Sequence, residues 1–280
     1  MAPNNGRAQA NADRNTGGNS GGKAGGDPGA TARRTLRTAV LTTAALALAV
    51  GGGVGWYAAR STDDPTSVAA SENAGADVAK PFVKPANTTG QDGTVVTYGK
   101  ADAKHTLSVW LDPRCPYCAG LEMGLGKVMK EQADQGLYKI EYHFATFLDG
   151  TLGGKGSKRT VNALGAAVNE SPEKFHAYLG VLYSNHPEKE SDDKFGSTST
   201  LLKLADQVPG LRSPAFNKAV KELTYMPWVD KVSAAFYESG VTGTPVVKLD
   251  GKELDVLSGK GIDSITPDAY KALVEAELKG

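Results

Sequence analysis

The feature that most constrains this chain is a pair of cysteines, Cys115 and Cys118, placed where a strand pattern changes into a helical one. Before the pair, apolar and polar residues alternate over 107–111, which predicts a β-strand. Pro113 ends that strand, because proline cannot donate a hydrogen bond to a sheet. After the pair, apolar residues recur at helical spacing over 121–129. The sequence therefore predicts that Cys115 begins a helix.

This position favours thiol chemistry at Cys115. Unpaired backbone N–H groups and the positive end of the helix dipole both stabilise a thiolate at the start of a helix. Cys118 lies about one turn further on the same face, within reach of a disulfide. Pro116 suits the first turn, where its missing N–H has no helical partner. We expect a reversible couple in which Cys115 exchanges with other thiols and Cys118 resolves the mixed disulfide.

Three other interpretations of the pair remain open. A C-x-x-C sequence is half of a zinc site, but the chain has two cysteines and four histidines without paired ligand spacing, so we expect no metal. A purely structural disulfide would close too short a loop to constrain the unfolded chain much. Inert buried thiols are the last alternative. We prefer the redox interpretation, with the Cys115–Cys118 disulfide as the redox group and no other cofactor.

The segment from Val109 to Cys118 resembles the strand–CPxC–helix of DsbA-like thiol-disulfide oxidoreductases, which belong to the thioredoxin superfamily. In that family a threonine or valine precedes a cis-proline at the start of a late strand facing the cysteines. Thr244 and Pro245 match this second landmark. The resemblance implies a cis bond before Pro245 and implies that both residues hold the backbone of a substrate. An ordinary turn is the alternative for this dipeptide.

Two more positions follow from the resemblance. Glu122 matches a place where family members carry an acidic residue near the cysteines, although an exposed helix carboxylate is the alternative. Tyr117 stands where strongly oxidising members often carry histidine, and a phenol stabilises a thiolate less than an imidazolium does. The resemblance thus makes Pro116, Tyr117 and Glu122 supporting residues of the site. Glutaredoxins share the Cys-Pro-Tyr-Cys sequence, but they are short cytosolic domains.

The N-terminal third predicts export rather than a fold. Residues 1–32 are rich in Asn, Gly and Ala, which predicts a disordered cytoplasmic tail. Residues 33–60 place three arginines before an uncharged apolar run of about the 20 residues that span a bilayer, so we expect one transmembrane anchor. A cleaved export signal is the alternative. Residues 61–91 predict a flexible linker to a domain outside the cytoplasmic membrane.

Residues 92–280 predict an α/β domain of the thioredoxin fold. Strand patterns cover 94–98 and 138–144, and the second strand should pair in parallel with 107–111. From about 151 to 240 helical patterns alone remain, as in the helical insertion of the DsbA-like family. Asp250-Gly251 then predicts a hairpin, and a last helix should begin near Pro267. The inserted helices are expected near 157–169, 171–182, 200–208, 214–223 and 228–239.

The expected function is an extracytoplasmic oxidoreductase that introduces disulfides into secreted proteins. Its partners would be thiols of secreted or cell-envelope proteins and a membrane redox partner that reoxidises the pair. Basic and acidic side chains cancel at 31 each, which gives no reason to expect nucleic acid. A disulfide reductase or isomerase of the same compartment is one alternative. A tethered binding or chaperone module with a structural disulfide is the other.

Overall fold

The computed structural model describes residues 80–279. The expected disordered tail of residues 1–32, the anchor or signal segment of residues 33–60 and most of the linker therefore lie outside the described residues. Among residues 80–279, no helix has the length and apolar character needed to cross a bilayer.

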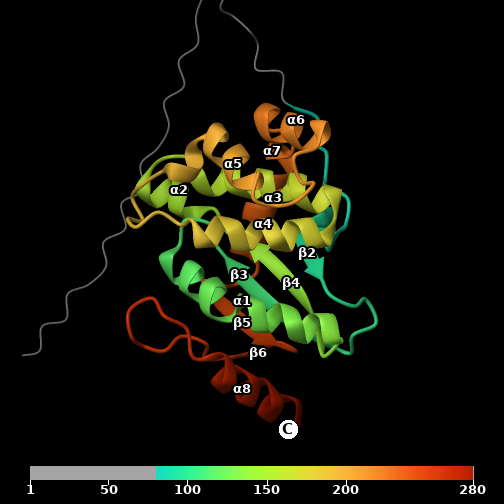
Figure 1. The fold of residues 1–280 in the computed structure, drawn as a ribbon, viewed down its shortest axis with the longest axis vertical. Helices are drawn as coiled ribbons and strands as arrows, with labels where there is room; N and C mark the ends of the chain where they lie inside the picture. The colour runs from blue at the N-terminus through green and yellow to red at the C-terminus, as the bar shows by residue number, and fades with distance from the viewer. Residues whose placement is uncertain (1–79, 280) are drawn as a thin grey trace, which may run out of the picture. The chain divides into compact units, whose positions relative to one another are not determined.

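Within the described residues, the strands form one six-stranded mixed sheet in the order β1-β2-β4-β3-β5-β6 (Figure 1). Only β3 and β4 pair in parallel; the other neighbours in this sheet are antiparallel. The strands are β1 (Thr88–Thr89), β2 (Val95–Tyr98), β3 (His105–Leu111), β4 (Tyr138–Phe144), β5 (Val246–Leu249) and β6 (Lys252–Glu253).

The predicted β-α-β unit is confirmed. Helix α1 (Pro116–Gln135) connects β3 to β4, whose register runs from His105 opposite Tyr138 to Leu111 opposite Phe144. The alternating side chains of β4 are buried on the face that meets α1, and there the rings of Tyr142 and Phe144 contact Phe175 of α4. Gly136 ends α1 with a left-handed φ of 85°, a conformation that glycine adopts without a Cβ penalty.

The predicted helical insertion is also confirmed, although it begins at Phe147 rather than near 151. Helix α2 was not expected, because six residues containing Gly150 carry too little periodicity to signal a helix. Ser171, Ser197 and Ser213 cap three of the inserted helices with their side chains. The helices are α2 (Phe147–Leu152), α3 (Gly156–Glu170), α4 (Pro172–Ser184), α5 (Thr198–Ala205), α6 (Pro214–Glu222) and α7 (Met226–Glu238), and α8 (Pro267–Lys279) follows the sheet.

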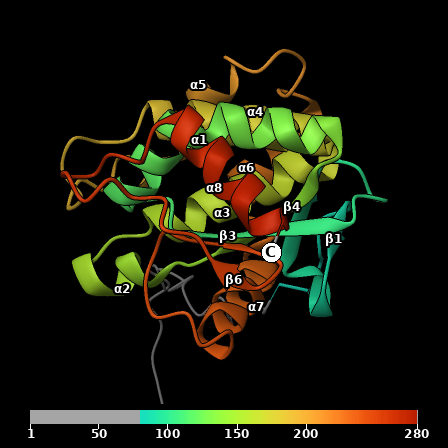
Figure 2. The same cartoon turned by 90° about the horizontal axis from the view of Figure 1, so that it is seen from below.

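Helices cover both faces of the sheet. On one face α1 packs on β4 and contacts α4 and α8 (Figures 1 and 2). On the other face α7 contacts β4, where Trp110 and Phe236 share a small apolar cluster. His143 is half-buried there and stacks on Trp110 with 4.5 Å between ring centroids.

The folded domain begins earlier than the expected boundary at residue 92. Thr88 and Thr89 pair with β2, Pro85 is buried, and the Trp228 indole donates a hydrogen bond to the Gly93 carbonyl at 2.8 Å. Two paired residues are too short to show strand periodicity, so the pattern gave no sign of β1. The linker therefore merges into the sheet before residue 92.

The return strand of the predicted Asp250-Gly251 hairpin is short, because β6 spans only Lys252–Glu253. After β6 the chain makes one more hydrogen bond to β5, from Leu254 N–H to the Val247 carbonyl at 2.9 Å. It then leaves β5, and Leu257 forms an isolated bridge with Ser264. The buried side chains of Leu254 and Val256 explain this departure, because they direct the segment into the core. A gap remains beside the first half of β5.

The loop that follows lies directly on α1. A Cβ at Gly120 would overlap the Ile262 carbonyl, and one at Gly124 would overlap the Ser264 hydroxyl. These two glycines therefore allow the loop to approach the first turns of α1, next to the cysteines. By contrast, a Cβ at Gly180 in α4 would meet no atom of the described residues within 4 Å.

We expect Gly120→Ala to lower the free energy of unfolding by about 1–3 kcal/mol, because the loop must move off the helix. Gly180→Ala is the matched control and should raise that free energy by about 0.5–1 kcal/mol, since alanine loses less backbone entropy in a helix. Urea titration of both variants measures the two effects. Equal values for the two variants would contradict the packing of the loop on α1.

Candidate redox site

The candidate site lies where β3 ends and α1 begins. Cys115 is the N-cap of α1 with extended backbone angles, and Pro116 follows as the first helical residue. The Cys115 carbonyl accepts the first helical hydrogen bond, from Ala119 N–H at 3.1 Å. Cys115 is 5% exposed and Cys118 is fully buried, and both are free thiols. The structure thus places one sulfur at the surface of the site and the other beneath it.

The groups around the Cys115 thiol favour its ionisation. The neighbouring Cys118 thiol, by hydrogen bonding, is the main cause that lowers the pKa of Cys115 to about 7. Burial opposes the shift, whereas the Cys118 N–H, the Thr244 side chain and the Tyr117 N–H support it. Hydrogen bonds to the charged form favour that form, so these donors stabilise a thiolate.

Cys118 has the opposite tendency. Burial raises the pKa of its thiol well above the usual value, and the nearby Cys115 adds to the shift. The pair therefore holds one sulfur that ionises near neutral pH and one that stays protonated. Such a difference is what a reactive cysteine and a resolving cysteine need.

The second predicted landmark faces the pair. The Cys115 sulfur lies 3.3 Å from the Thr244 carbonyl oxygen, although the two residues are 129 positions apart. The peptide bond between Thr244 and Pro245 is cis, as the resemblance implied. The Thr244 hydroxyl is buried and has no hydrogen-bond partner within residues 80–279, so its proton is free for a thiolate. The fold thus brings Cys115, Cys118, Thr244 and Pro245 together.

Glu122 lies on the buried face of α1 beyond the cysteines, and the interpretation as an exposed carboxylate is wrong. Only 7% of Glu122 is exposed, and it lies one helical turn beyond Cys118. Burial raises the pKa of its carboxyl group to about 7. Gly126 leaves the space, since a Cβ there would lie 2.6 Å from the Glu122 Oε2. Tyr117, in contrast, is 44% exposed at the rim of the site, and Pro116 is half-buried.

The sequence analysis did not single out Asp112, which the structure buries directly before the site. Its carboxylate accepts hydrogen bonds from the Ser157 hydroxyl at 2.6 Å, from Arg114 N–H at 3.0 Å and from Leu148 N–H at 3.2 Å. Its carbonyl accepts from the Tyr183 hydroxyl at 3.2 Å and from Cys115 N–H at 2.9 Å. Burial raises the pKa of Asp112 to about 6. Two charged residues around the strand-ending Pro113 were the only available signal.

Arg114 is the other buried residue that the sequence did not single out. It is 1% exposed, although it directly precedes Cys115 at a turn. Its guanidinium lies 3.1 Å from the Asp149 carboxylate, which belongs to α2 of the helical insertion. The turn before the reactive cysteine is therefore attached to the insertion.

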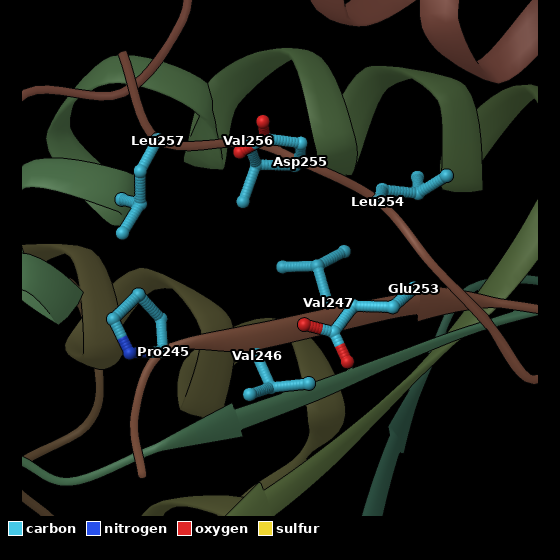
Figure 3. A pocket seen from close by; sticks show the side chains of 8 residues that line it. All are labelled: Pro245, Val246, Val247, Glu253, Leu254, Asp255, Val256 and Leu257. Carbon is cyan, nitrogen blue, oxygen red and sulfur yellow. The ribbon is translucent and has the colours of Figure 1, made fainter. Parts of the chain in front are cut away.

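A groove continues from Pro245 along the free side of β5 (Figure 3). Its volume is about 340 Å³. Val247 and Leu257 point into the gap from opposite sides, and the exposed residues Glu253 and Asp255 are among those that line it. The groove therefore combines an apolar floor with acidic groups, next to the sulfur pair.

Among residues 80–279, no group of three or more His, Cys, Asp or Glu side chains has an arrangement that could hold a metal ion.

Comparison with known proteins identifies the fold and the family. A family model described as thioredoxin matches residues 91–276. The thiol:disulfide interchange protein DsbL of Lelliottia amnigena is 26% identical over 199 residues, which cover 67% of this chain and 87% of that protein. The predicted resemblance to DsbA-like proteins of the thioredoxin superfamily is confirmed.

Solved structures share the fold at low sequence identity. Oxidised BdbD from Bacillus subtilis is 23% identical and has a TM-score of 0.54, covering 70% of this chain and 97% of that protein. The thiol-disulfide oxidoreductase MdbA of Actinomyces oris is 19% identical with a TM-score of 0.55, covering 69% and 89%.

We expect the ultraviolet absorbance of the reduced full chain to show one thiol ionising near pH 7 and none further until well above the usual thiol range. Because folding lowers the pKa of Cys115, its ionisation stabilises the reduced protein fully above the usual thiol pKa. That contribution is lost as the pH falls through about 7.

Two variants control this titration. Cys115→Ser should remove the step near pH 7, and Cys118→Ala should move it to higher pH, because the Cys118 thiol is the main stabilising group. A wild-type step at the ordinary pKa of a thiol would contradict the geometry described above.

Proposed function

The chain belongs to the thioredoxin family, and from this premise we propose that it introduces disulfides into exported proteins outside the cytoplasmic membrane. Its chemistry is dithiol/disulfide exchange. The observation that carries the proposal is the arrangement of a thiolate-prone Cys115 at a helix start, a buried Cys118 beneath it and Thr244 3.3 Å away.

The reaction begins with the Cys115–Cys118 disulfide. A substrate thiolate attacks the Cys115 sulfur, the disulfide breaks, and Cys118 leaves with the electron pair of that bond. A second substrate thiolate then attacks the substrate sulfur of the mixed disulfide, and Cys115 leaves as a thiolate. Two electrons pass from the substrate to the pair, and a membrane redox partner removes them to restore the disulfide.

Cys118 needs a proton when it leaves, because a thiolate at a fully buried position is unfavourable. Glu122 is the residue suited to supply it. Its pKa of about 7 allows it to give a proton and take one back, and its Oε1 has no hydrogen-bond partner in the described part of the chain. Asp112 is less suited, since its carboxylate already accepts three hydrogen bonds.

Thr244 and Pro245 would hold the backbone of the substrate beside the mixed disulfide. Pro245 has no N–H to donate to a neighbouring strand, so regular sheet pairing stops at this end of β5. The groove beyond it has an apolar floor for a substrate side chain. Glu253 and Asp255 among its lining residues favour substrates with a nearby lysine or arginine.

The compartment follows from the N-terminal segment. Residues 33–60 would either anchor the chain in the membrane or direct its export, and the domain would then meet secreted and cell-envelope thiols. The name of the related Lelliottia protein, thiol:disulfide interchange protein, supports the exchange chemistry.

We expect Cys115→Ser to abolish thiol-disulfide exchange and Cys118→Ser to accumulate mixed disulfides with substrate, because the resolving sulfur is gone. Oxidative refolding of a reduced, disulfide-containing protein measures the first effect, and non-reducing gel electrophoresis detects the second. Full activity of Cys115→Ser would overturn the mechanism. Ser184→Ala, at an exposed position of α4, is a control that leaves both sulfurs in place and should retain exchange.

A second candidate is a reductase or isomerase of the same compartment. It is favoured by the pKa of Cys115, since a value of about 7 is also that of thioredoxin, a reductant. The exposed Tyr117 points the same way, because a phenol adds no positive charge beside the thiolate.

The reduction potential of the pair decides between these candidates. If the chain introduces disulfides as proposed, we expect a value toward about −120 mV, the strongly oxidising end of known couples. Equilibration of the full chain with glutathione buffers measures it. A value near about −270 mV, that of thioredoxin, would favour the reductase and count against the oxidase.

A further inference from the structure

Arg114 links the reactive turn to three separate segments of the helical insertion. Its guanidinium donates to the Gly153 carbonyl at 2.6 Å, to the Asp149 carboxylate at 3.1 Å and to the Glu190 carbonyl at 3.2 Å. Asp149 lies in α2, Gly153 lies in the loop before α3, and Glu190 lies in the loop after α4. Only 1% of Arg114 is exposed, so these bonds form away from water.

The acceptors are themselves fixed. The Asp149 carboxylate accepts from the N–H groups of Ser157 and Lys158 at the start of α3, both at 2.9 Å. Asp193, 3.8 Å from the Arg114 guanidinium, accepts from Gly156 N–H at 2.7 Å. The start of α3 is therefore built around two carboxylates with Arg114 between them. A guanidinium held by such partners has little freedom to move.

The backbone of Arg114 is held from the other side. Its N–H donates to the Asp112 carboxylate at 3.0 Å, and the following Cys115 N–H donates to the Asp112 carbonyl at 2.9 Å. Pro113 fixes φ between these residues. Side-chain bonds to the insertion and backbone bonds to the turn thus meet in one residue next to the reactive sulfur.

We propose that Arg114 is a positioning residue through which the helical insertion holds the Cys115 turn and sets how readily its thiol reacts. The groups that stabilise the thiolate are the Cys118 thiol, two N–H groups of the first helical turn and the Thr244 side chain. Hydrogen bonds weaken steeply when their distance and angle change, so a looser turn would stabilise the thiolate less. The inference rests on the proposed exchange chemistry and adds the insertion as a determinant of it.

The test compares Arg114→Lys with Arg159→Lys in the full chain. Lysine keeps the charge but cannot span three acceptors in a planar fork. Arg159 lies in the same insertion and donates to the Gly196 carbonyl at 2.7 Å and to the Thr198 hydroxyl at 3.3 Å, away from the cysteine turn. Both variants should lose stability, but only Arg114→Lys should change the ionisation of Cys115.

We expect Arg114→Lys to raise the pKa of the Cys115 thiol by about one unit. At a pH below that pKa, the fraction of Cys115 present as thiolate then falls roughly tenfold. The reduction potential should become more negative, because the reduced form loses stabilisation. Asp149→Asn, which removes the charge partner but keeps an acceptor oxygen, should give a smaller shift in the same direction. It also serves if Arg114→Lys fails to fold.

An unchanged Cys115 titration in folded Arg114→Lys, or equal shifts in Arg114→Lys and Arg159→Lys, would overturn the proposal. Either result leaves the exchange chemistry intact, since that chemistry is tested by loss of activity in Cys115→Ser. Failure of the proposed function and failure of this inference are therefore distinguishable.

Discussion

The structure depends on placing two sulfurs, one helical turn apart, under opposite electrostatic conditions. Cys115 requires hydrogen-bond donors for a negative charge, whereas Cys118 is kept neutral by burial. The start of a helix meets both demands within four residues, because its first N–H groups are unpaired and its inner face points into the core. The sheet, the helical insertion and the segment before β5 all contact the start of α1 or the turn before it.

The topology explains how distant segments supply the site. Since β3 lies between β4 and β5, its end is near the middle of the sheet. The antiparallel pairing of Trp110 with Val246 brings the residues before β5 to the same end. Thr244 therefore reaches Cys115 without any local sequence signal between them. The insertion, placed between β4 and β5, is in turn positioned to close over the turn before Cys115.

Local patterns predicted much of this arrangement and missed what depends on long-range packing. The alternation in β4, the helical spacing after Cys118 and Gly136 are short-range signals, and they placed the β-α-β unit correctly. The burial of charged side chains could not be seen in this way. Glu122 is buried because Gly126 leaves room for it, and Asp112 because Ser157, 45 residues away, donates to it. The sequence around a charged residue does not show which distant residues will pair with it, so sequence analysis predicts an exposed position.

Asp112 and Glu122 are both buried carboxylates, but their hydrogen bonds suit them to different roles. Burial raises the pKa of both, to about 6 for Asp112 and about 7 for Glu122. Asp112 accepts hydrogen bonds from a hydroxyl and two N–H groups, so its protonation would leave donors in the interior without an acceptor. Glu122 keeps an oxygen without such a bond among the described residues, and protonation there breaks nothing at that atom. Asp112 is therefore committed to holding the turn, together with Arg114. In the proposed mechanism, Glu122 is the carboxylate left to exchange a proton with the buried sulfur.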